Sequence, residues 1–160
     1  MTKVCKILVG LPGTGKSTYT MRNIVKNDEY ASSDNIIEVI AEQHFMTYDQ
    51  AFSDLIGFAE KVFWEELNYA AANDRSIWVD RTNLSVKSRK RVIDVFKNKG
   101  FIFEAIVFPI PVDWEARLAG RVGKTIPPHV LQDMKQRFQF PTMGEGFGKI
   151  EIYDEQLQNV

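Results

Sequence analysis

The residues with the clearest chemical potential lie near the start of the chain, between Gly10 and Thr18. Residues 10–17 read Gly-Leu-Pro-Gly-Thr-Gly-Lys-Ser and fit the phosphate-binding pattern Gly-x4-Gly-Lys-[Ser/Thr] at every fixed position. The glycines let the backbone curl so that N–H groups point at phosphate oxygens, and a helix starting at Gly15 adds its positive end. Lys16 is suited to reach the β- and γ-phosphates, and the Ser17 hydroxyl is suited to bind Mg²⁺. The predicted nucleotide site comprises Gly10, Leu11, Pro12, Gly13, Thr14, Gly15, Lys16, Ser17 and Thr18.

A second element of a nucleotide site follows an apolar run in the middle of the chain. The run 77–79 reads as a buried strand and ends in Asp80, whose carboxylate is placed to orient Mg²⁺ directly or through water. Capping of the following turn is the alternative role for Asp80. The Asn-Lys-x-Asp motif that reads guanine is absent, because the one Asn-Lys pair is followed by Gly-Phe. The sequence therefore predicts ATP and Mg²⁺ as cofactors, with Ser17 and Asp80 as metal-binding residues.

Two further features favour phosphoryl transfer to an acceptor over hydrolysis. Asp34 follows a short expected strand, so it falls near the carboxyl edge of a sheet, where a carboxylate can take the proton of an attacking hydroxyl. N-capping of the next helix is an equally good role for Asp34 on sequence alone. Arg117 and Arg121 are spaced i, i+4, which puts both on one face of a helix, and Lys124 follows. They predict a cationic lid over a polyphosphate, and the alternative is a solvated helix face.

The elements that must position these residues alternate between strand-like and helix-like patterns. Short apolar runs predict strands at residues 4–9, 30–33, 76–79, 101–108 and 149–153. Apolar spacing and capping residues predict helices at 15–26, from 34 onward, and at 49–73, 85–99 (closed by Gly100), 112–121 and 128–138. This alternation is typical of an α/β protein with a mainly parallel central sheet flanked by helices. We expect a single domain, residues 1–160, with a helical lid at about 112–127.

Composition and charge limit the class of protein. The chain has 160 residues, 44% of them hydrophobic, which suffices for one domain without disulfides or structural metal. A single cysteine excludes a disulfide framework, and no apolar run approaches the ~20 residues that span a bilayer, so we expect a cytoplasmic protein without membrane contact. Net charge is -1, yet residues 28–66 carry ten acidic and one basic residue, while 85–124 carry nine basic and four acidic. Such polarity is compatible with a polyanion on one face, and two solvated helix faces are the alternative.

Together these residues resemble the kinase domain of phage-type 5′-polynucleotide kinases. The resemblance runs from Lys6 to about Phe138, which is most of the chain. It is carried by the loop 10–18, by Asp34, by the run Asp80-Arg81-Thr82-Asn83-Leu84, and by the pattern Arg117-x3-Arg121-x2-Lys124-x2-Pro127. The combination of the Asp-x-Thr-Asn turn with the paired arginines is far more specific than the phosphate-binding loop alone.

The resemblance implies a P-loop kinase fold in which ATP donates its γ-phosphate to the 5′-hydroxyl of DNA or RNA. It implies that Asp34 is the general base and that Arg117 and Arg121 contact the phosphates from the lid. The full implied sets are a catalytic group of Lys16, Asp34, Arg117 and Arg121, and an acceptor site formed by Asp34, Thr82 and Asn83.

One position departs from that family's pattern and keeps the acceptor open. The family carries an arginine three residues after the catalytic aspartate, where it grips the acceptor's 3′-phosphate, and this chain has Ile37 there in a strongly acidic segment. The leading interpretation is an ATP-dependent polynucleotide kinase whose partner is a 5′-hydroxyl end of DNA or RNA. A kinase for a small acceptor such as a nucleoside or sugar is the second interpretation, which Ile37 favours. An ATP-binding switch or adaptor without transfer is the third.

Overall fold

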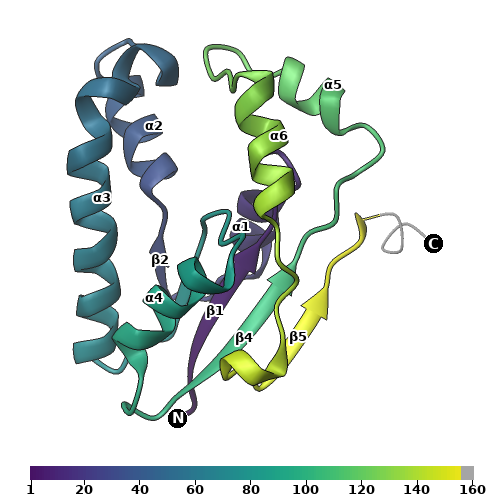
Figure 1. The fold of residues 1–160 in the computed structure, drawn as a ribbon. Coiled ribbons are helices and arrows are strands. Elements are labelled where there is room, and N and C mark those ends of the chain that lie inside the picture. The colour runs from purple at the N-terminus through teal and green to yellow at the C-terminus, as the bar shows by residue number, and fades with distance from the viewer. Residues whose placement is uncertain (156–160) are drawn as a thin grey trace.

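A parallel sheet forms the centre of the protein. The computed structural model describes residues 1–155, so the last five residues of the predicted domain lie outside the described part. The strands are β1 (Lys3–Val9), β2 (Glu29–Ala31), β3 (Ile77–Val79), β4 (Phe101–Val107) and β5 (Lys149–Ile152). They form one five-stranded sheet in the order β2-β3-β1-β4-β5, and every neighbouring pair is parallel (Figure 1). The predicted α/β class and the parallel sheet are therefore confirmed.

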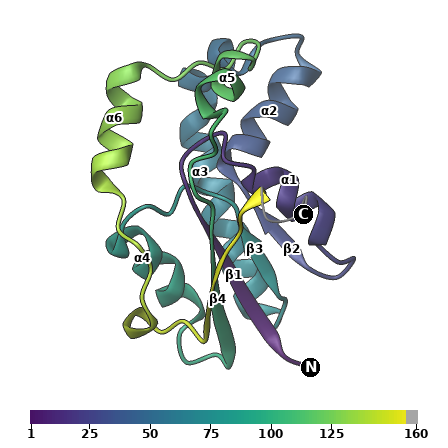
Figure 2. The ribbon, with the colours of Figure 1, turned by 90° about the vertical axis from the view of Figure 1, so that its right-hand side faces the viewer.

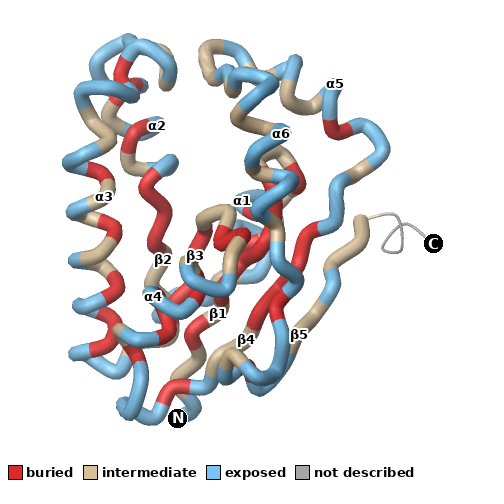
Figure 3. The backbone as a smooth tube through the Cα atoms, in the orientation of Figure 1, coloured by how far each residue is buried: buried red, intermediate tan, exposed pale blue. Residues whose placement is uncertain are grey.

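Helices cover both faces of this sheet. They are α1 (Lys16–Asn23), α2 (Ser33–Gln43), α3 (Tyr48–Ala72), α4 (Val86–Phe96), α5 (Trp114–Ala119) and α6 (Pro128–Arg137). One core joins β1, β3 and β4 to α3 and α4, and it includes Phe63 and Phe96, which have no exposed surface. The other face packs Leu8, Trp78 and Phe108 against Tyr19 of α1. Figure 2 shows α1 on the side of the sheet opposite α4, and Figure 3 shows the buried backbone concentrated in the strands between the helices.

The parallel arrangement gathers the chemically interesting loops at one edge. Because parallel strands run in one direction, the segments that leave β1, β2 and β3 emerge together at their carboxyl ends. The segment carrying α5 and α6 lies over this edge, where Leu11 and Leu84 pack against Trp114. Figure 1 shows α2, α5 and α6 together at the upper end of the molecule.

Several expected element ends are wrong, including those of α1, which ends at Asn23, and β2, which ends at Ala31, and three others have a clear local cause. The side chain of Ser32, not Asp34, caps α2, because its Oγ accepts a hydrogen bond from the backbone N–H of Asn35 at 3.2 Å. Helix α4 ends at Phe96 rather than at Gly100, since Lys97 is extended and Asn98 takes a positive φ of 61°. Helix α5 ends at Ala119, with Gly120 at its C-cap.

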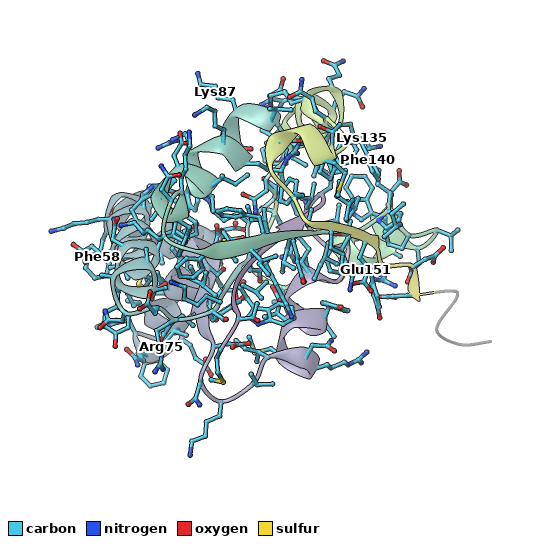
Figure 4. The ribbon with its side chains drawn as sticks, turned by 90° about the horizontal axis from the view of Figure 1, so that it is seen from below. Phe58, Arg75, Lys87, Lys135, Phe140 and Glu151 are labelled. Atoms are coloured by element: carbon cyan, nitrogen blue, oxygen red, sulfur yellow. The ribbon has the colours of Figure 1, made fainter. Side chains whose placement is uncertain are left out.

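The outer faces of the helices carry solvated side chains. Figure 4, which looks at the sheet from below, shows labelled side chains such as Phe58 of α3 and Lys87 of α4 at the outer surface of the molecule. Among the described residues, no helix is both long and apolar enough to cross a membrane.

Candidate active site

The phosphate-binding loop connects β1 to α1 and has the backbone shape that its glycines predict. Gly13 and Gly15 take positive φ values of 75° and 100°, a conformation that residues with a Cβ rarely adopt. The Thr14 hydroxyl donates to the Leu11 carbonyl at 2.8 Å. The loop is also tied to the segment above it, because the indole N–H of Trp114 donates to the Pro12 carbonyl at 2.6 Å. The loop is thus preformed and supported on two sides.

The Lys16 side chain folds back onto the loop and is largely buried. Its ammonium donates to the carbonyls of Gly10 at 2.9 Å and Leu11 at 2.7 Å, and the residue is 8% exposed. Burial lowers the pKa of this ammonium from 10.5 to about 8, while the carboxylates of Asp80 and Asp34 act in the opposite direction. The loop itself offers this cation only neutral carbonyl oxygens. A bound polyphosphate would place anionic oxygens beside it.

Ser17, Asp80 and Tyr30 form a hydrogen-bonded cluster beside the loop. The Ser17 hydroxyl donates to Asp80 Oδ2 at 2.7 Å, and the Tyr30 hydroxyl donates to the same oxygen at 2.5 Å. Burial and the adjacent carboxylate raise the pKa of Tyr30 above its usual range, so it stays a donor. Hydroxyl and carboxylate oxygens are the hard ligands that Mg²⁺ prefers, and the ion keeps most of its waters. The two residues predicted for the metal therefore lie together and suit it chemically.

Asp34 lies in the first turn of α2 with its carboxylate held from two sides. The Tyr48 hydroxyl donates to Oδ1 at 2.8 Å, and the Lys124 ammonium lies 3.3 Å from Oδ2. Lys124 also pairs with Glu38 at 2.6 Å and lies over the Tyr48 ring, 4.4 Å from its centroid. Because Ser32 caps the helix, the Asp34 side chain remains available for chemistry.

The two arginines predicted for the lid occupy different environments. Arg117 lies on α5 and pairs with Asp113 at 2.9 Å and Glu155 at 2.6 Å. Arg121 lies beyond the end of α5, so the expectation that both arginines share one helix face is wrong. Nη1 of Arg121 is buried and has no hydrogen-bond partner among the described residues. An unpaired buried guanidinium nitrogen is costly, and an anionic ligand would satisfy it.

The loop between α5 and α6 is fastened to the start of α3. The Asp49 N–H donates to the Gly123 carbonyl at 2.9 Å. In return, the N–H and hydroxyl of Thr125 donate to the Asp49 carboxylate at 3.0 and 2.8 Å. Gly123 has a φ of +70°, and a Cβ at this position would lie 2.6 Å from Thr47 Cβ. These contacts hold the loop in place, and Lys124 of this loop therefore lies beside Asp34.

The predicted site residues converge on one pocket, which we call the main pocket. It has a volume of about 460 Å³. Its lining combines the phosphate-binding loop with residues from every other predicted group, namely Asp34, Asp80, Thr82, Arg117, Arg121 and Lys124. Three residues of the loop, Gly10, Leu11 and Thr14, do not line this pocket. Their hydrogen bonds hold the shape of the loop and the position of the Lys16 side chain.

Asn83 stands apart from the other predicted acceptor-side residues. It is 4% exposed and does not line the main pocket. Its side-chain amide donates to the Leu8 carbonyl at 2.7 Å, and its backbone takes a positive φ of 47°. Asn83 therefore anchors the turn after β3 to strand β1, whereas Thr82 lines the pocket. The structure corrects the expectation that Asn83 contacts an acceptor directly.

Several polar residues at the site escaped the sequence analysis. Tyr30, Tyr48, Glu38 and Glu155 contact Asp80, Asp34, Lys124 and Arg117 through the bonds described above. Tyr48 and Asp34 are 14 positions apart and the other three pairs are at least 38 apart, so periodicity and local spacing hold no signal for them. Tyr48 does directly follow the N-cap Thr47, but a tyrosine at that place predicts nothing about its partner.

A family model decides the classification of this chain. The model of an AAA domain family matches residues 6–141, which is most of the sequence. The chain belongs to this AAA domain family. The match includes the phosphate-binding loop, Asp34, Asp80 and both arginines, so the AAA domain assignment covers the residues of the main pocket, while β5 lies outside it.

Relatives of this AAA domain are kinases. The chain is 26% identical over 154 residues to the bifunctional polynucleotide phosphatase/kinase of Schizosaccharomyces pombe, covering 91% of this chain and 32% of that protein. It is 28% identical over 138 residues to the L-seryl-tRNA(Sec) kinase of Methanococcus maripaludis, covering 84% and 52%. The chain thus spans a third to a half of these relatives. A structure of the Pnkp1/Rnl/Hen1 RNA repair complex superposes with a TM-score of 0.59 at 22% identity, covering 88% and 48%, and shows the shared fold. The predicted P-loop kinase fold is confirmed.

Proposed function

We propose that this AAA domain is an ATP-dependent polynucleotide kinase that transfers the γ-phosphate of ATP to the 5′-hydroxyl end of DNA or RNA. The observation that carries the proposal is the main pocket, where a phosphate-binding loop faces a carboxylate and two arginines across one cavity. Transfer chemistry needs these parts together, because positioning and charge stabilisation supply most of the catalysis. Similarity to a polynucleotide phosphatase/kinase over 91% of the chain supports the nucleic-acid acceptor.

In the proposed reaction, the acceptor hydroxyl attacks the γ-phosphorus of ATP. A new O–P bond forms while the bond to the β-phosphate oxygen breaks, and ADP leaves with that oxygen. Asp34 takes the hydroxyl proton on Oδ2 as Lys124 moves away from that oxygen, while the hydrogen bond from Tyr48 holds Oδ1. Lys16 and Arg121 supply positive charge where negative charge accumulates on the phosphoryl group.

Ser17 and Asp80 would hold Mg²⁺ in this proposal. When bound, the ion neutralises charge on the β- and γ-phosphates. Tyr30 would keep the Asp80 carboxylate oriented, since its hydroxyl already donates to Oδ2. Arg117 must exchange its partner Glu155 for phosphate oxygens before it acts on the nucleotide.

The direct test is an acceptor screen. The protein is incubated with γ-labelled ATP, Mg²⁺ and DNA or RNA oligonucleotides that carry either a 5′-hydroxyl or a 5′-phosphate. We expect label on the 5′-hydroxyl oligonucleotides alone. Absence of label from DNA and RNA of every length would falsify the proposal.

A small-molecule acceptor is the second candidate, and one observation favours it. Ile37 is fully buried beside Ala41 and Ala51, so this position cannot contact an acceptor phosphate. Glu38 adds a carboxylate to the wall of the main pocket. The same screen tests this candidate when it includes nucleosides and sugars, and label on these alone would support it.

A further inference from the structure

A second cavity opens beside the main pocket, and we call it the outer groove. It has a volume of about 440 Å³ and lies between α2, the start of α3 and the loop that carries Lys124. Its lining residues are Glu38, Ala41, Glu42, Met46, Thr47, Tyr48, Arg121, Val122 and Lys124. Three of them, Glu38, Arg121 and Lys124, also line the main pocket, so the two cavities share a wall.

The proposed base lies at this shared boundary. Asp34 lines the main pocket, and its two carboxylate oxygens contact Tyr48 and Lys124, both of which line the outer groove. An acceptor hydroxyl that reaches Asp34 therefore stands next to the groove. The part of the acceptor that bears this hydroxyl can therefore bind in the adjoining groove.

The outer groove exposes two large hydrophobic side chains among its polar ones. Val122 is 97% exposed and Met46 is 40% exposed, although both are large hydrophobic side chains. A flexible methionine beside small apolar groups adapts well to a flat ring. Exposed apolar side chains in a concave setting mark a place that a ligand covers.

The charged groups of the groove select against phosphate and in favour of hydrogen-bond donors. Glu38 and Glu42 stand one turn apart on α2, and Lys124 already neutralises Glu38. Glu42 is exposed, and its carboxylate has no hydrogen bond or ion pair with any residue in 1–155. A free carboxylate repels a phosphodiester, whereas it accepts hydrogen bonds from the amino or imino groups of a nucleobase. The two cations of the groove, Arg121 and Lys124, also line the main pocket and are shared between the two cavities.

We propose that the outer groove binds the nucleobase of the acceptor's 5′-terminal nucleotide. This inference rests on the proposed function and extends it. The uncharged base lies against Met46 and Val122, and Glu42 accepts hydrogen bonds from its donor edge. The phosphates of the strand extend out of the site on the side that faces away from α2. Guanine, which offers adjacent imino and amino donors to one carboxylate, is the preferred base.

The experiment compares acceptors that differ only at the 5′-terminal position. Short 5′-hydroxyl oligonucleotides carry guanine, thymine or an abasic residue at that position, and kcat/KM is measured for each with saturating ATP. We expect the abasic end to be about tenfold poorer than guanine, because stacking on a protein surface is worth about 1–3 kcal/mol per base. Thymine is expected to lie between them.

Matched variants separate the groove from the rest of the protein. Met46→Ala should reduce the difference between guanine and abasic ends to less than about threefold, and Glu42→Gln should reduce the preference for guanine over thymine. Val39→Ala on the outer side of α2 and Asp54→Asn on α3 are exposed controls that should preserve both preferences, since neither residue lines the groove.

The outcomes distinguish this inference from the proposed function. Equal kcat/KM for base-bearing and abasic ends overturns the inference while leaving polynucleotide kinase activity in place. A preference that survives Met46→Ala and Glu42→Gln, but disappears in Met21→Ala, places the base in the main pocket and also overturns it. Failure to phosphorylate any oligonucleotide overturns both.

Discussion

In the proposed reaction the main pocket has a phosphate side and an acceptor side, and the two are built in different ways. The phosphate side is local, since Gly13, Gly15, Lys16 and Ser17 come from one continuous loop and its helix. The acceptor side is assembled from distant segments, because Asp34, Tyr48 and Lys124 lie on α2, α3 and the loop after α5. On the phosphate side the cation is buried, whereas the Asp34 side chain is 56% exposed.

This contrast has a functional meaning. A loop that folds through its own backbone conformation keeps its geometry whatever the acceptor, which suits a nucleotide common to many kinases. A site held by side-chain contacts between separate segments can change its partners without disturbing the sheet. We therefore expect substitutions on the phosphate side and at the junction to impair nucleotide binding or transfer, and substitutions on the acceptor side to lower transfer while ATP binding is kept.

Arg121→Ala should give the largest effect, because Arg121 stands at the junction of both sides. Loss of a transition-state arginine lowers the transfer rate by about 10³-fold or more in related chemistry. Single-turnover transfer from labelled ATP measures this rate, and Arg137→Ala, an exposed arginine on α6, is the control. A rate within threefold of the wild type would remove Arg121 from the reaction.

Asp34→Asn should separate the two sides most clearly. Removing a general base lowers turnover by about 10²–10⁴-fold. ATP affinity should remain within about twofold, since the hydrogen bond and the ion pair of Asp34 go to Tyr48 and Lys124 and not to the phosphate-binding loop. Turnover and equilibrium ATP binding are measured on the same preparation. Retained turnover would reject Asp34 as the base, and lost ATP binding would reject the separation of the two sides.

Tyr48→Phe should have a smaller effect. A hydrogen bond to a charged group contributes about 1.5–3 kcal/mol, so its loss should cost about tenfold in kcat. ATP affinity should stay within about twofold, because Tyr48 bonds to Asp34 and does not line the main pocket.

Tyr69→Phe is the matched control for that experiment. Tyr69 lies on the same helix, is 54% exposed and does not line the pocket. Its variant should keep both kcat and ATP affinity. An unchanged kcat in Tyr48→Phe would mean that the bond from Tyr48 does not support Asp34 in the reaction.

The smallest expected effect concerns Lys16 and tests the buried side. Its pKa is lowered to about 8, so the free protein loses this positive charge as pH rises through 8. Nucleotide phosphates favour the charged form, and ATP affinity should therefore fall above pH 8, by at most about tenfold per pH unit. Calorimetry in two buffers of different ionisation enthalpy should show proton uptake on binding at pH 9 and much less at pH 7.5. Equal uptake at both pH values would contradict this.

The same contrast explains what the sequence could predict. The loop 10–17, the strand before Asp80 and the parallel sheet follow from local patterns, and the structure contains all three. Convergence of Asp34 and Asp80 at one edge follows from strand direction alone. The sequence does not identify Ser32 as the cap, because serine and aspartate cap helices equally well and the apolar pattern does not distinguish start positions two residues apart.

The acceptor side was predictable only in part, for a physical reason. Lys124 reaches Asp34 because the loop after α5 is fastened to α3, a contact between residues 76 positions apart. Tyr48 reaches it because α3 packs against α2. Arg121 was placed on a helix because spacing takes no account of where a helix ends, and Gly120 ends this one. Asn83 lies in a motif, yet its amide is used inside the fold.

The geometry at Gly123 determines which residues of the loop between α5 and α6 can vary in evolution. Its positive φ and its close approach to Thr47 leave no room for another side chain. Its neighbour Val122 is almost fully exposed at the rim of the outer groove. One position of the loop is therefore fixed while the next is free to change. Descendants of this chain could alter their choice of acceptor by exchanging single side chains around that glycine, with the loop still seated on α3.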